Sequence, residues 1–209
     1  MKVISLLSGG LDSPVAVYMM LKQGCDVVAV HFHQQTSTNG AQNKVVKLVK
    51  YLKKFGNLKL YLVPFKDIQL ELIKHVPAKV RMLVYRRFMF RIAELILKKE
   101  SANALVTGDS LGQVASQTVE NLVAVYSSVK SKIFTPLLGE NKKDIVKTAR
   151  EIGTYDLSIL PYEDCCSFLV SPHPNLKSSA SVLENCEQAL DVESLVRKGF
   201  EGSRLADLD

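Results

Sequence analysis

The chain has 209 residues, of which 47% are hydrophobic and 23% are charged, with 11 Gly, 7 Pro and no Trp. These proportions exclude the collagen-like, coiled-coil and disordered classes, and the length suits one well-packed domain with a small appendage. The net charge is +6, but residues 1–100 carry a net +11 and residues 101–209 a net −5. The first half is therefore the part expected to attract a polyanion.

No segment approaches the ~18 consecutive apolar residues that a membrane-spanning helix needs. The N-terminal sequence MKVISLLSGG also lacks the apolar core of a signal peptide. We therefore expect no membrane association and a cytoplasmic location. Four cysteines (Cys25, Cys165, Cys166 and Cys186) are too few and too unevenly spaced for a disulfide scaffold, so the adjacent pair needs another explanation.

Short β-branched runs alternate with longer segments of helical periodicity, which predicts an α/β fold: one three-layer domain with a twisted, mostly parallel sheet. The expected strands are Val3–Leu7, Asp26–Phe32, Leu58–Val63, Ala104–Thr107 and an extended Ile133–Leu138. The expected helices are Ser13–Gln23, Lys44–Phe55, Lys66–Val76, Lys79–Lys99, one near Gln113–Val125, and Lys142–Ile152. We assign residues 1–175 to a catalytic domain and residues 176–209 to a C-terminal helical appendage.

A glycine- and serine-rich loop, Ser8-Gly9-Gly10-Leu11-Asp12-Ser13, joins the first strand to the first helix. Its glycines allow a sharp turn and a close approach to an anion, its hydroxyls can donate hydrogen bonds, and the helix that follows presents free N–H groups. The loop matches neither the Walker A spacing nor the dinucleotide fingerprint. This sequence predicts a different kind of phosphate-binding loop at the carboxyl edge of the sheet.

A second polar turn, TGDSLGQVASQT at residues 107–118, follows a predicted strand. Gly108 and Gln117 are expected to make a second contact with the nucleotide or substrate. Gln113 and Gln117 lie one turn apart if this segment is helical, and so would point the same way.

SGGLDS resembles the signature of the N-type ATP pyrophosphatases, the PP-loop family. The chain also contains TGDSLGQVASQT, Lys142 and Lys143 at the start of a predicted helix, and the segment PYEDCC at residues 161–166. In combination these motifs resemble the tRNA 4-thiouridine synthetases, which are tRNA sulfurtransferases linked to thiamine biosynthesis. The resemblance covers residues 1–174. It implies a PP-loop fold, adenylation of O4 of a tRNA uridine by ATP with release of pyrophosphate, and displacement of AMP by a persulfide sulfur.

The resemblance also implies roles for individual residues. The pyrophosphatase loop corresponds to Ser8, Gly9, Gly10, Asp12 and Ser13. The functionally required lysine corresponds to Lys142, with Lys143 as the alternative if the register slips by one. The sulfur-carrying cysteine is Cys165 or Cys166. His31 and Phe32 are expected to border the adenine, and Mg²⁺ is expected with the triphosphate because it neutralises charge on the leaving pyrophosphate.

The predicted helix at residues 79–99 carries several arginines. Arg87 and Arg91 lie four residues apart on one face, and we expect them to contact tRNA phosphates, although solvated arginines are the plain alternative. A metal site built from the adjacent cysteines with His31, His33 or His173 is less favoured, because adjacent cysteines rarely ligate one metal well.

Members of the family that this chain resembles usually carry an N-terminal tRNA-binding THUMP domain, and some carry a C-terminal rhodanese domain. Neither is recognisable here, so we expect either that this chain is a fragment or that partner proteins provide tRNA docking and sulfur, with a cysteine desulfurase or a rhodanese-type protein as the persulfide donor. A homodimer is left open. The alternative functions are another PP-loop ligase that activates an amide or carbonyl group, and a nucleotide-binding module without catalysis of its own.

Overall fold

A computed structural model describes residues 1–34, 40–161 and 171–208. Its six-stranded sheet has the order β5-β4-β1-β2-β3-β6. The strands are β1 (Lys2–Leu6), β2 (Asp26–His33), β3 (Leu58–Pro64), β4 (Ala104–Val106), β5 (Ile133–Phe134) and β6 (Arg204–Leu205). All neighbours are parallel except β6, which runs antiparallel to β3. This confirms the predicted mostly parallel sheet.

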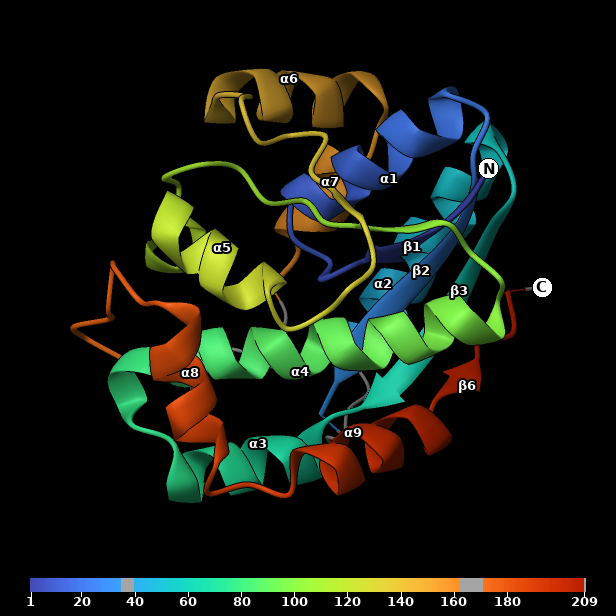
Figure 1. Cartoon of the computed structure of the whole chain (residues 1–209). Coiled ribbons are helices and arrows are strands. Elements are labelled where there is room, and N and C mark those ends of the chain that lie inside the picture. The colour runs from blue at the N-terminus through green and yellow to red at the C-terminus, as the bar shows by residue number, and fades with distance from the viewer. Residues whose placement is uncertain (35–39, 162–170, 209) are drawn as a thin grey trace.

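Helices cover both faces of the sheet (Figure 1). One face carries α1 (Asp12–Lys22), α2 (Gly40–Leu52), the short helix η1 (Lys53–Phe55), α6 (Lys142–Glu151) and α7 (Tyr155–Ile159). The other carries α3 (Lys66–His75), α4 (Ala78–Lys99), α5 (Val119–Tyr126), α8 (Ala180–Glu187) and α9 (Val192–Glu201). No helix in the described part of the chain is long and apolar enough to cross a bilayer.

The two hydrophobic cores follow from side-chain alternation along the strands. On β1, Val3 packs into the core beneath α1, whereas Ile4 packs into the core beneath α4. On β2, Val27 and Val28 divide in the same way. Because both faces of the central strands are buried, these strands are almost continuously apolar, as parallel strands under two helical layers must be.

The helix predicted near Gln113–Val125 begins later than expected. Gly112 adopts a left-handed φ of +73°, Val114 is extended, and residues 115–117 form only the short helix η2 (Ala115–Gln117). The hydroxyl of Thr118 accepts a hydrogen bond from the backbone N–H of Asn121 and so caps α5. Gln113 and Gln117 therefore lie on a turn before the helix and not on one helical face.

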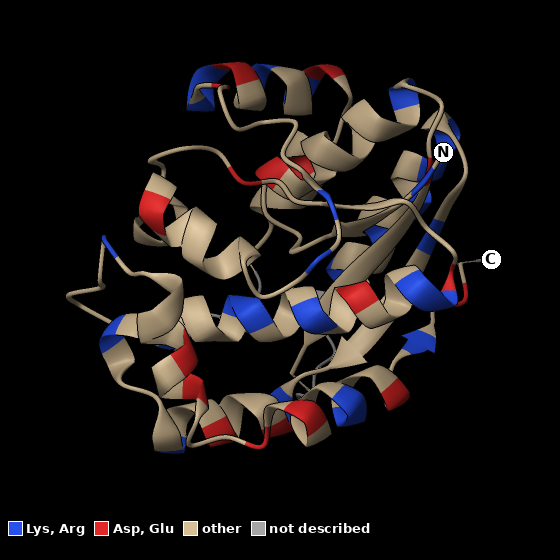
Figure 2. Ribbon diagram, viewed as in Figure 1, with Lys and Arg blue, Asp and Glu red and all other residues tan. Residues whose placement is uncertain are grey.

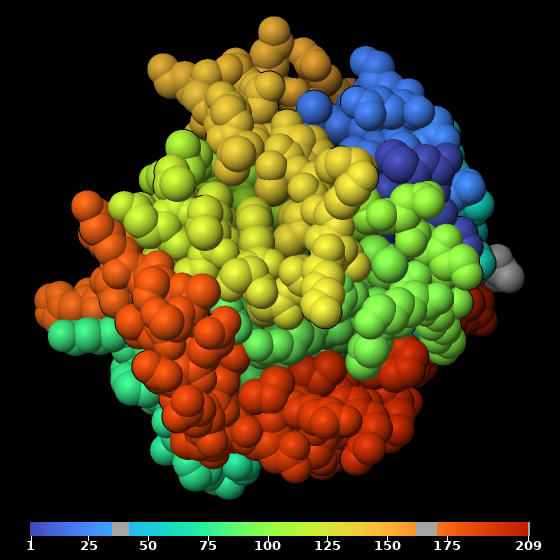
Figure 3. Space-filling view, in the orientation of Figure 1, coloured from blue at the N-terminus to red at the C-terminus, as the bar shows by residue number. Residues whose placement is uncertain are grey.

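The C-terminal residues contribute to the same core as the catalytic part of the chain. Leu183 of α8 and Val196 of α9 are buried against α4 residues, and β6 extends the sheet beyond β3. Figure 3 shows these residues, in orange and red, lying directly against the green surface of α4. The division at residue 175 stays a prediction, but residues 176–208 pack as part of the fold.

Candidate functional site

A cavity of about 940 Å³ opens at the carboxyl ends of the central strands, within the size range of small-molecule sites. After β1 the chain continues to β2, which pairs with one edge of β1, whereas β4 pairs with the other edge of β1. Ligands of open parallel sheets bind where the strand order reverses in this way. The walls come from the loops after β1 and β4, from the end of β2, from the first part of α4, from Lys142 and from Ser171, Pro174 and Asn175.

The predicted phosphate loop forms one wall of this cavity. The Ser13 hydroxyl accepts a hydrogen bond from the backbone N–H of Ser8 at 3.1 Å, and the Ser8 hydroxyl accepts one from the N–H of Gly10 at 3.3 Å. Gly9 has a φ of +87°, which a side chain would strain. Among the described residues no side chain caps the first turn of α1, so its N–H groups are left to bind an anion.

An ion pair joins this loop to a distant part of the chain. The Lys142 ammonium lies 2.5 Å from Oδ1 of Asp12. Asn141 accepts a hydrogen bond from the N–H of Asp144 and caps α6, which places Lys142 in the first turn, and α6 packs against α1. Lys142 lines the cavity and Lys143 is not among its lining residues, so the geometry favours Lys142 over the alternative register.

Gly108 is required by a close backbone approach. A Cβ atom at this position would lie 2.8 Å from both the N and Cα atoms of Ser13. The turn after β4 therefore packs directly on the phosphate loop, and only glycine leaves room for this contact. Gly108 was predicted as a nucleotide contact; the structure adds that it holds two cavity walls together.

The floor of the cavity holds a buried carboxylate, Asp109. It accepts hydrogen bonds from Arg86 at 2.5 Å, the Tyr126 hydroxyl at 2.6 Å, the Thr107 hydroxyl at 2.9 Å and the Gln117 amide at 3.1 Å. Burial opposes ionisation of Asp109, but the Arg86 charge and these hydrogen bonds outweigh it and hold the pKa of Asp109 below its ordinary value. Burial and the neighbouring Asp109 raise the pKa of Tyr126. The site is thus a rigid network around a fixed negative charge.

Sequence reasoning missed the face of α4 that this network uses. The cavity-lining residues of α4 include Lys79, Met82, Arg86 and Met89. These residues are spaced three or four positions apart and so form one stripe along the helix. This periodicity could have been recognised in the sequence. The sequence places Arg86 on a different side of the helix from Arg87, but it does not identify Asp109 as the partner of Arg86, because 23 residues separate the two.

The remaining predicted nucleotide residues are brought to the same cavity. His31 and Phe32 line it at the end of β2, and Gln117 lines it after β4. The His31 imidazole Nδ1 lies 2.9 Å from the carbonyl oxygen of Leu7, which ties β2 to the residue before the phosphate loop. Phe32 packs edge-to-face on Phe65. Their roles toward a nucleotide stay predictions.

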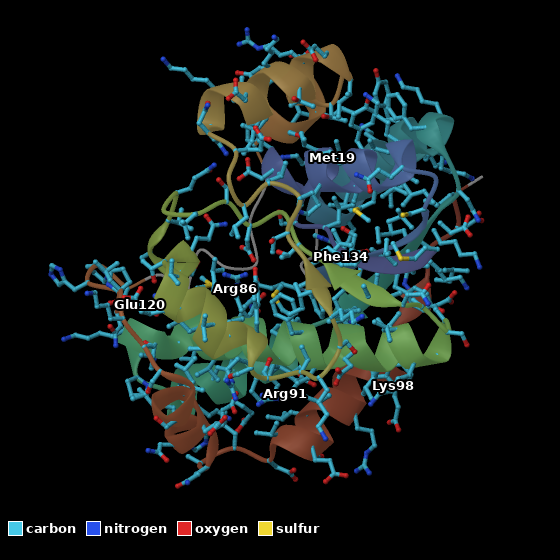
Figure 4. All side chains as sticks on the ribbon, turned by 45° about the horizontal axis from the view of Figure 1, so that its top comes forward. Met19, Arg86, Arg91, Lys98, Glu120 and Phe134 are labelled. Atoms are coloured by element: carbon cyan, nitrogen blue, oxygen red, sulfur yellow. The ribbon has the colours of Figure 1, made fainter. Side chains whose placement is uncertain are left out.

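The structure pairs both arginines that were expected to contact tRNA phosphates with a carboxylate of the same chain. Arg87 is only 1% exposed, and its guanidinium lies 2.8 Å from Glu187. Arg91 donates two hydrogen bonds of 2.7 Å to the same carboxylate. Figure 2 shows acidic residues of α8 beside basic residues of α4, and Figure 4 shows Arg91 and Arg86 on different sides of that helix. Both arginines bind α8. Arg87 is buried, which argues against a phosphate contact there, whereas the Arg91 side chain is 18% exposed and its phosphate contact stays a prediction.

Cys165 and Cys166 lie outside the described residues, so their predicted role in carrying sulfur stays a prediction. Cys25 is buried and Cys186 is partly buried. Within residues 1–34, 40–161 and 171–208 no cluster of three or more potential metal ligands occurs. His173, one residue of the less favoured metal hypothesis, lies on the surface.

Relatives of known sequence are about 45% identical to this chain. A probable tRNA sulfurtransferase of Caldanaerobacter subterraneus subsp. tengcongensis is 45% identical over 197 residues, which are 93% of this chain and 52% of the relative. One of Thermus thermophilus is 46% identical over 197 residues, 93% of this chain and 48% of the relative. The chain thus spans about half the length of the curated relatives it matches.

Solved structures agree with the fold. The crystal structure of a 4-thiouridine synthetase–RNA complex with bound ATP superposes with a TM-score of 0.93 at 41% identity, covering 98% of this chain and 54% of that one. An NMN synthetase from Francisella tularensis shares only the fold, with a TM-score of 0.56 at 10% identity over 95% of this chain and 83% of that one. The family model of the thiamine biosynthesis protein ThiI matches residues 1–192, and the chain belongs to that family.

Proposed function

We propose that this chain is the ATP-dependent catalytic part of a tRNA sulfurtransferase that converts a tRNA uridine to 4-thiouridine. The observation that carries the proposal is the convergence of the phosphate loop, the start of α1 and the Asp12–Lys142 pair on one cavity. Support also comes from the relatives named tRNA sulfurtransferases and from the similar synthetase that was crystallised with RNA and ATP.

In this proposal the phosphates of ATP bind the loop from Ser8 to Ser13, where backbone N–H groups and hydroxyls face the cavity. The adenine lies toward the end of β2, where Phe32, Met82 and Leu83 offer apolar surface. This places the α-phosphate near β1, between the adenine wall and the turn after β4. The position is one where a second substrate can reach the phosphorus atom.

Mg²⁺ fits these residues. Mg²⁺ prefers oxygen ligands and is commonly held by one or two carboxylates together with substrate phosphates, and Asp12 supplies a carboxylate at the phosphate loop. The ion would neutralise charge on the pyrophosphate as it leaves. Lys142, which Asp12 holds, would stabilise negative charge that develops on the phosphate oxygens during the displacement.

The proposed reaction has three steps. The uridine O4 attacks the α-phosphorus, pyrophosphate leaves and the proton at N3 of the base is released. The outer sulfur of a persulfide on Cys165 or Cys166 then attacks C4 and AMP leaves, so that the base is joined to the cysteine by an S–S bond. A second thiol attacks the cysteine sulfur, which releases 4-thiouridine and leaves a disulfide. A cysteine desulfurase or rhodanese-type protein would supply the sulfur, and a THUMP domain elsewhere would help to dock tRNA. We further propose that the reaction takes place in the cytoplasm; a homodimer is left as an alternative.

The test is an assay with ATP, Mg²⁺, unmodified tRNA and a persulfide donor, in which pyrophosphate and 4-thiouridine are both measured. We expect both products from the wild-type chain. Lys142→Met should lower the rate about 100- to 1,000-fold, because a charge aimed at the transition state is lost. Its stability should change by less than about 0.5 kcal/mol, because the ion pair is exposed.

Lys143→Met is the matched control, because Lys143 follows Lys142 directly but lies outside the cavity lining. Equal losses in the two variants would contradict the role of Lys142. Pyrophosphate release that depends on a small amide acceptor and not on tRNA would instead indicate another PP-loop ligase. ATP binding without turnover on any acceptor would indicate a nucleotide-binding module.

A further inference from the structure

Two buried amide atoms in the wall of the cavity have no hydrogen-bond partner within the described ranges. They are Nε2 of Gln113 and Oε1 of Gln117, and both residues line the cavity that contains the phosphate loop. Buried polar side-chain atoms in folded proteins nearly always have a partner, and an exception calls for an explanation. A ligand that brings one donor and one acceptor would satisfy both atoms.

The orientation of the Gln117 amide is fixed by the hydrogen bond that its nitrogen makes. Its Nε2 donates to Oδ1 of Asp109 at 3.1 Å, and an ionised carboxylate only accepts hydrogen bonds. The nitrogen must therefore face Asp109, which leaves the oxygen as the unpartnered atom. Asp109 is itself fixed by Arg86 and Tyr126, so Gln117 presents a preorganised acceptor.

The position of the two glutamines separates them from the adenine wall. Both follow β4, whereas Phe32 ends β2, and β1 with the phosphate loop lies between these two strands. A nucleotide with its base toward β2 and its phosphates on the loop leaves the β4 side open for the acceptor. The glutamines thus lie on the side from which a nucleophile would approach the α-phosphate.

We propose that Gln117 and Gln113 recognise the imide edge of the acceptor uracil; this rests on the proposed function. Uracil presents N3–H, a donor, between two carbonyl oxygens. Oε1 of Gln117 accepts from N3–H, and Nε2 of Gln113 donates to a neighbouring carbonyl oxygen. Cytosine carries a hydrogen-bond acceptor at N3. This acceptor would face the Gln117 oxygen, which is also an acceptor, so the two glutamines select uracil over cytosine.

The decisive experiment is a double-mutant cycle between Gln117 and the base. Binding of tRNA that carries either uridine or 3-methyluridine at the target position is measured for wild type and Gln117→Ala in the presence of a non-hydrolysable ATP analogue. The methyl group replaces the N3 proton, and binding is measured because adenylation at O4 itself releases that proton. We expect each single change to weaken tRNA binding on the order of 10- to 100-fold, and the two together to cost little more than one alone.

Gln113→Leu tests the second contact, with Gln188→Leu as a control because Gln188 is exposed and does not line the cavity. We expect Gln113→Leu to lower kcat/KM for uridine tRNA about tenfold and Gln188→Leu to leave it unchanged. The affinity of each variant for ATP is measured in parallel, and thermal unfolding verifies that each variant is folded. If Gln117→Ala does not fold, the wild-type comparison of uridine with 3-methyluridine and the Gln113 variant carry the test.

The outcomes separate the two proposals. Additive losses in the cycle, or equal wild-type affinity for tRNA with uridine and with 3-methyluridine, would overturn the uracil contact while pyrophosphate is still released with unmodified tRNA. A loss of ATP affinity that accounts for the whole effect would assign the glutamines to adenine instead. No pyrophosphate from the wild type with unmodified tRNA would overturn the proposed function, and the uracil contact with it.

Discussion

Arg86 and Arg87 occupy consecutive positions on α4, and each holds a buried carboxylate, but the two carboxylates lie in different regions. Arg86 faces the cavity and binds Asp109, whereas Arg87 faces α8 and binds Glu187 together with Arg91. A step of one residue turns the side chain by about 100° around a helix. The same chemistry therefore fixes the floor of the site on one side of α4 and the C-terminal helices on the other.

The comparison also changes the meaning of the charge asymmetry. The positive first half of the chain suggested a landing surface for tRNA, with Arg87 and Arg91 as contacts. Glu187 belongs to the acidic second half and neutralises these two arginines within the fold. Part of the charge asymmetry along the sequence therefore disappears when α8 docks on α4, and it says less about tRNA than the totals suggested.

The largest expected effect is on the C-terminal side of α4. Glu187→Ala should lower the free energy of unfolding by about 3–5 kcal/mol, because it leaves two guanidinium groups without their buried partner. The affinity for ATP should stay within about twofold of wild type. Chemical denaturation and calorimetric titration at a temperature where the variant is folded measure both.

Glu184→Ala is the matched control for this prediction. Glu184 also lies near Arg87, at 3.6 Å, but its side chain is 57% exposed. Its removal should cost less than about 1 kcal/mol. A loss of ATP affinity in the Glu187 variant that equals its loss of stability would show that the two sides of α4 are not independent.

A smaller effect is expected at Gly108, on the cavity side. Gly108→Ala places a Cβ atom against the backbone of Ser13, and backbone cannot move aside as a flexible side chain can. We expect a loss of about 1–3 kcal/mol in stability and at least a tenfold weaker affinity for ATP, because the phosphate loop is displaced.

Gly139→Ala is its control, since a Cβ atom there would meet nothing within 4 Å and φ is not left-handed. This variant should bind ATP like the wild type. Normal ATP affinity in Gly108→Ala would mean that the contact between the two loops does not shape the phosphate site.

The smallest effect is a pH dependence that separates the two carboxylates. Burial would raise the pKa of Glu187, but hydrogen bonds and charge from Arg91 and Arg87 outweigh it and lower that pKa below its ordinary 4.5. The stabilisation is therefore fully present above pH 4.5 and is lost as the pH falls through the folded-state pKa. The pKa of Asp109 is likewise lowered below its ordinary value of 3.8, so the stabilisation from Asp109 is fully present above pH 3.8 and is lost at lower pH.

We expect Glu187→Gln to flatten the loss of unfolding free energy between about pH 5 and pH 3, by on the order of 1 kcal/mol for each pKa unit of difference between folded and unfolded states. Asp109→Asn should flatten the curve only at the lower end of this range. Denaturation curves across the range measure both, and identical profiles for both variants and wild type would argue against ionised, stabilising carboxylates.

Much of the site was predictable because it is local. The phosphate loop, its glycines and the helix after it are contiguous, so the chemistry of Ser8–Ser13 could be inferred from neighbouring residues. Lys142 is distant, and it was predicted only through resemblance to a family. The start of α5 was misplaced because the cap at Thr118 and the turn at Gly112 interrupt an otherwise helical pattern.

The sequence alone determined the alternation of strands and helices, the phosphate loop at the end of β1 and the membership of residues in apolar cores, because these depend on periodicity and on short-range backbone preferences. Only the tertiary structure decided which buried charge each arginine of α4 meets, why Gly108 must be glycine and that the C-terminal helices complete the core. Those features depend on contacts between segments far apart in the chain, whose relative rotation and approach no local pattern specifies.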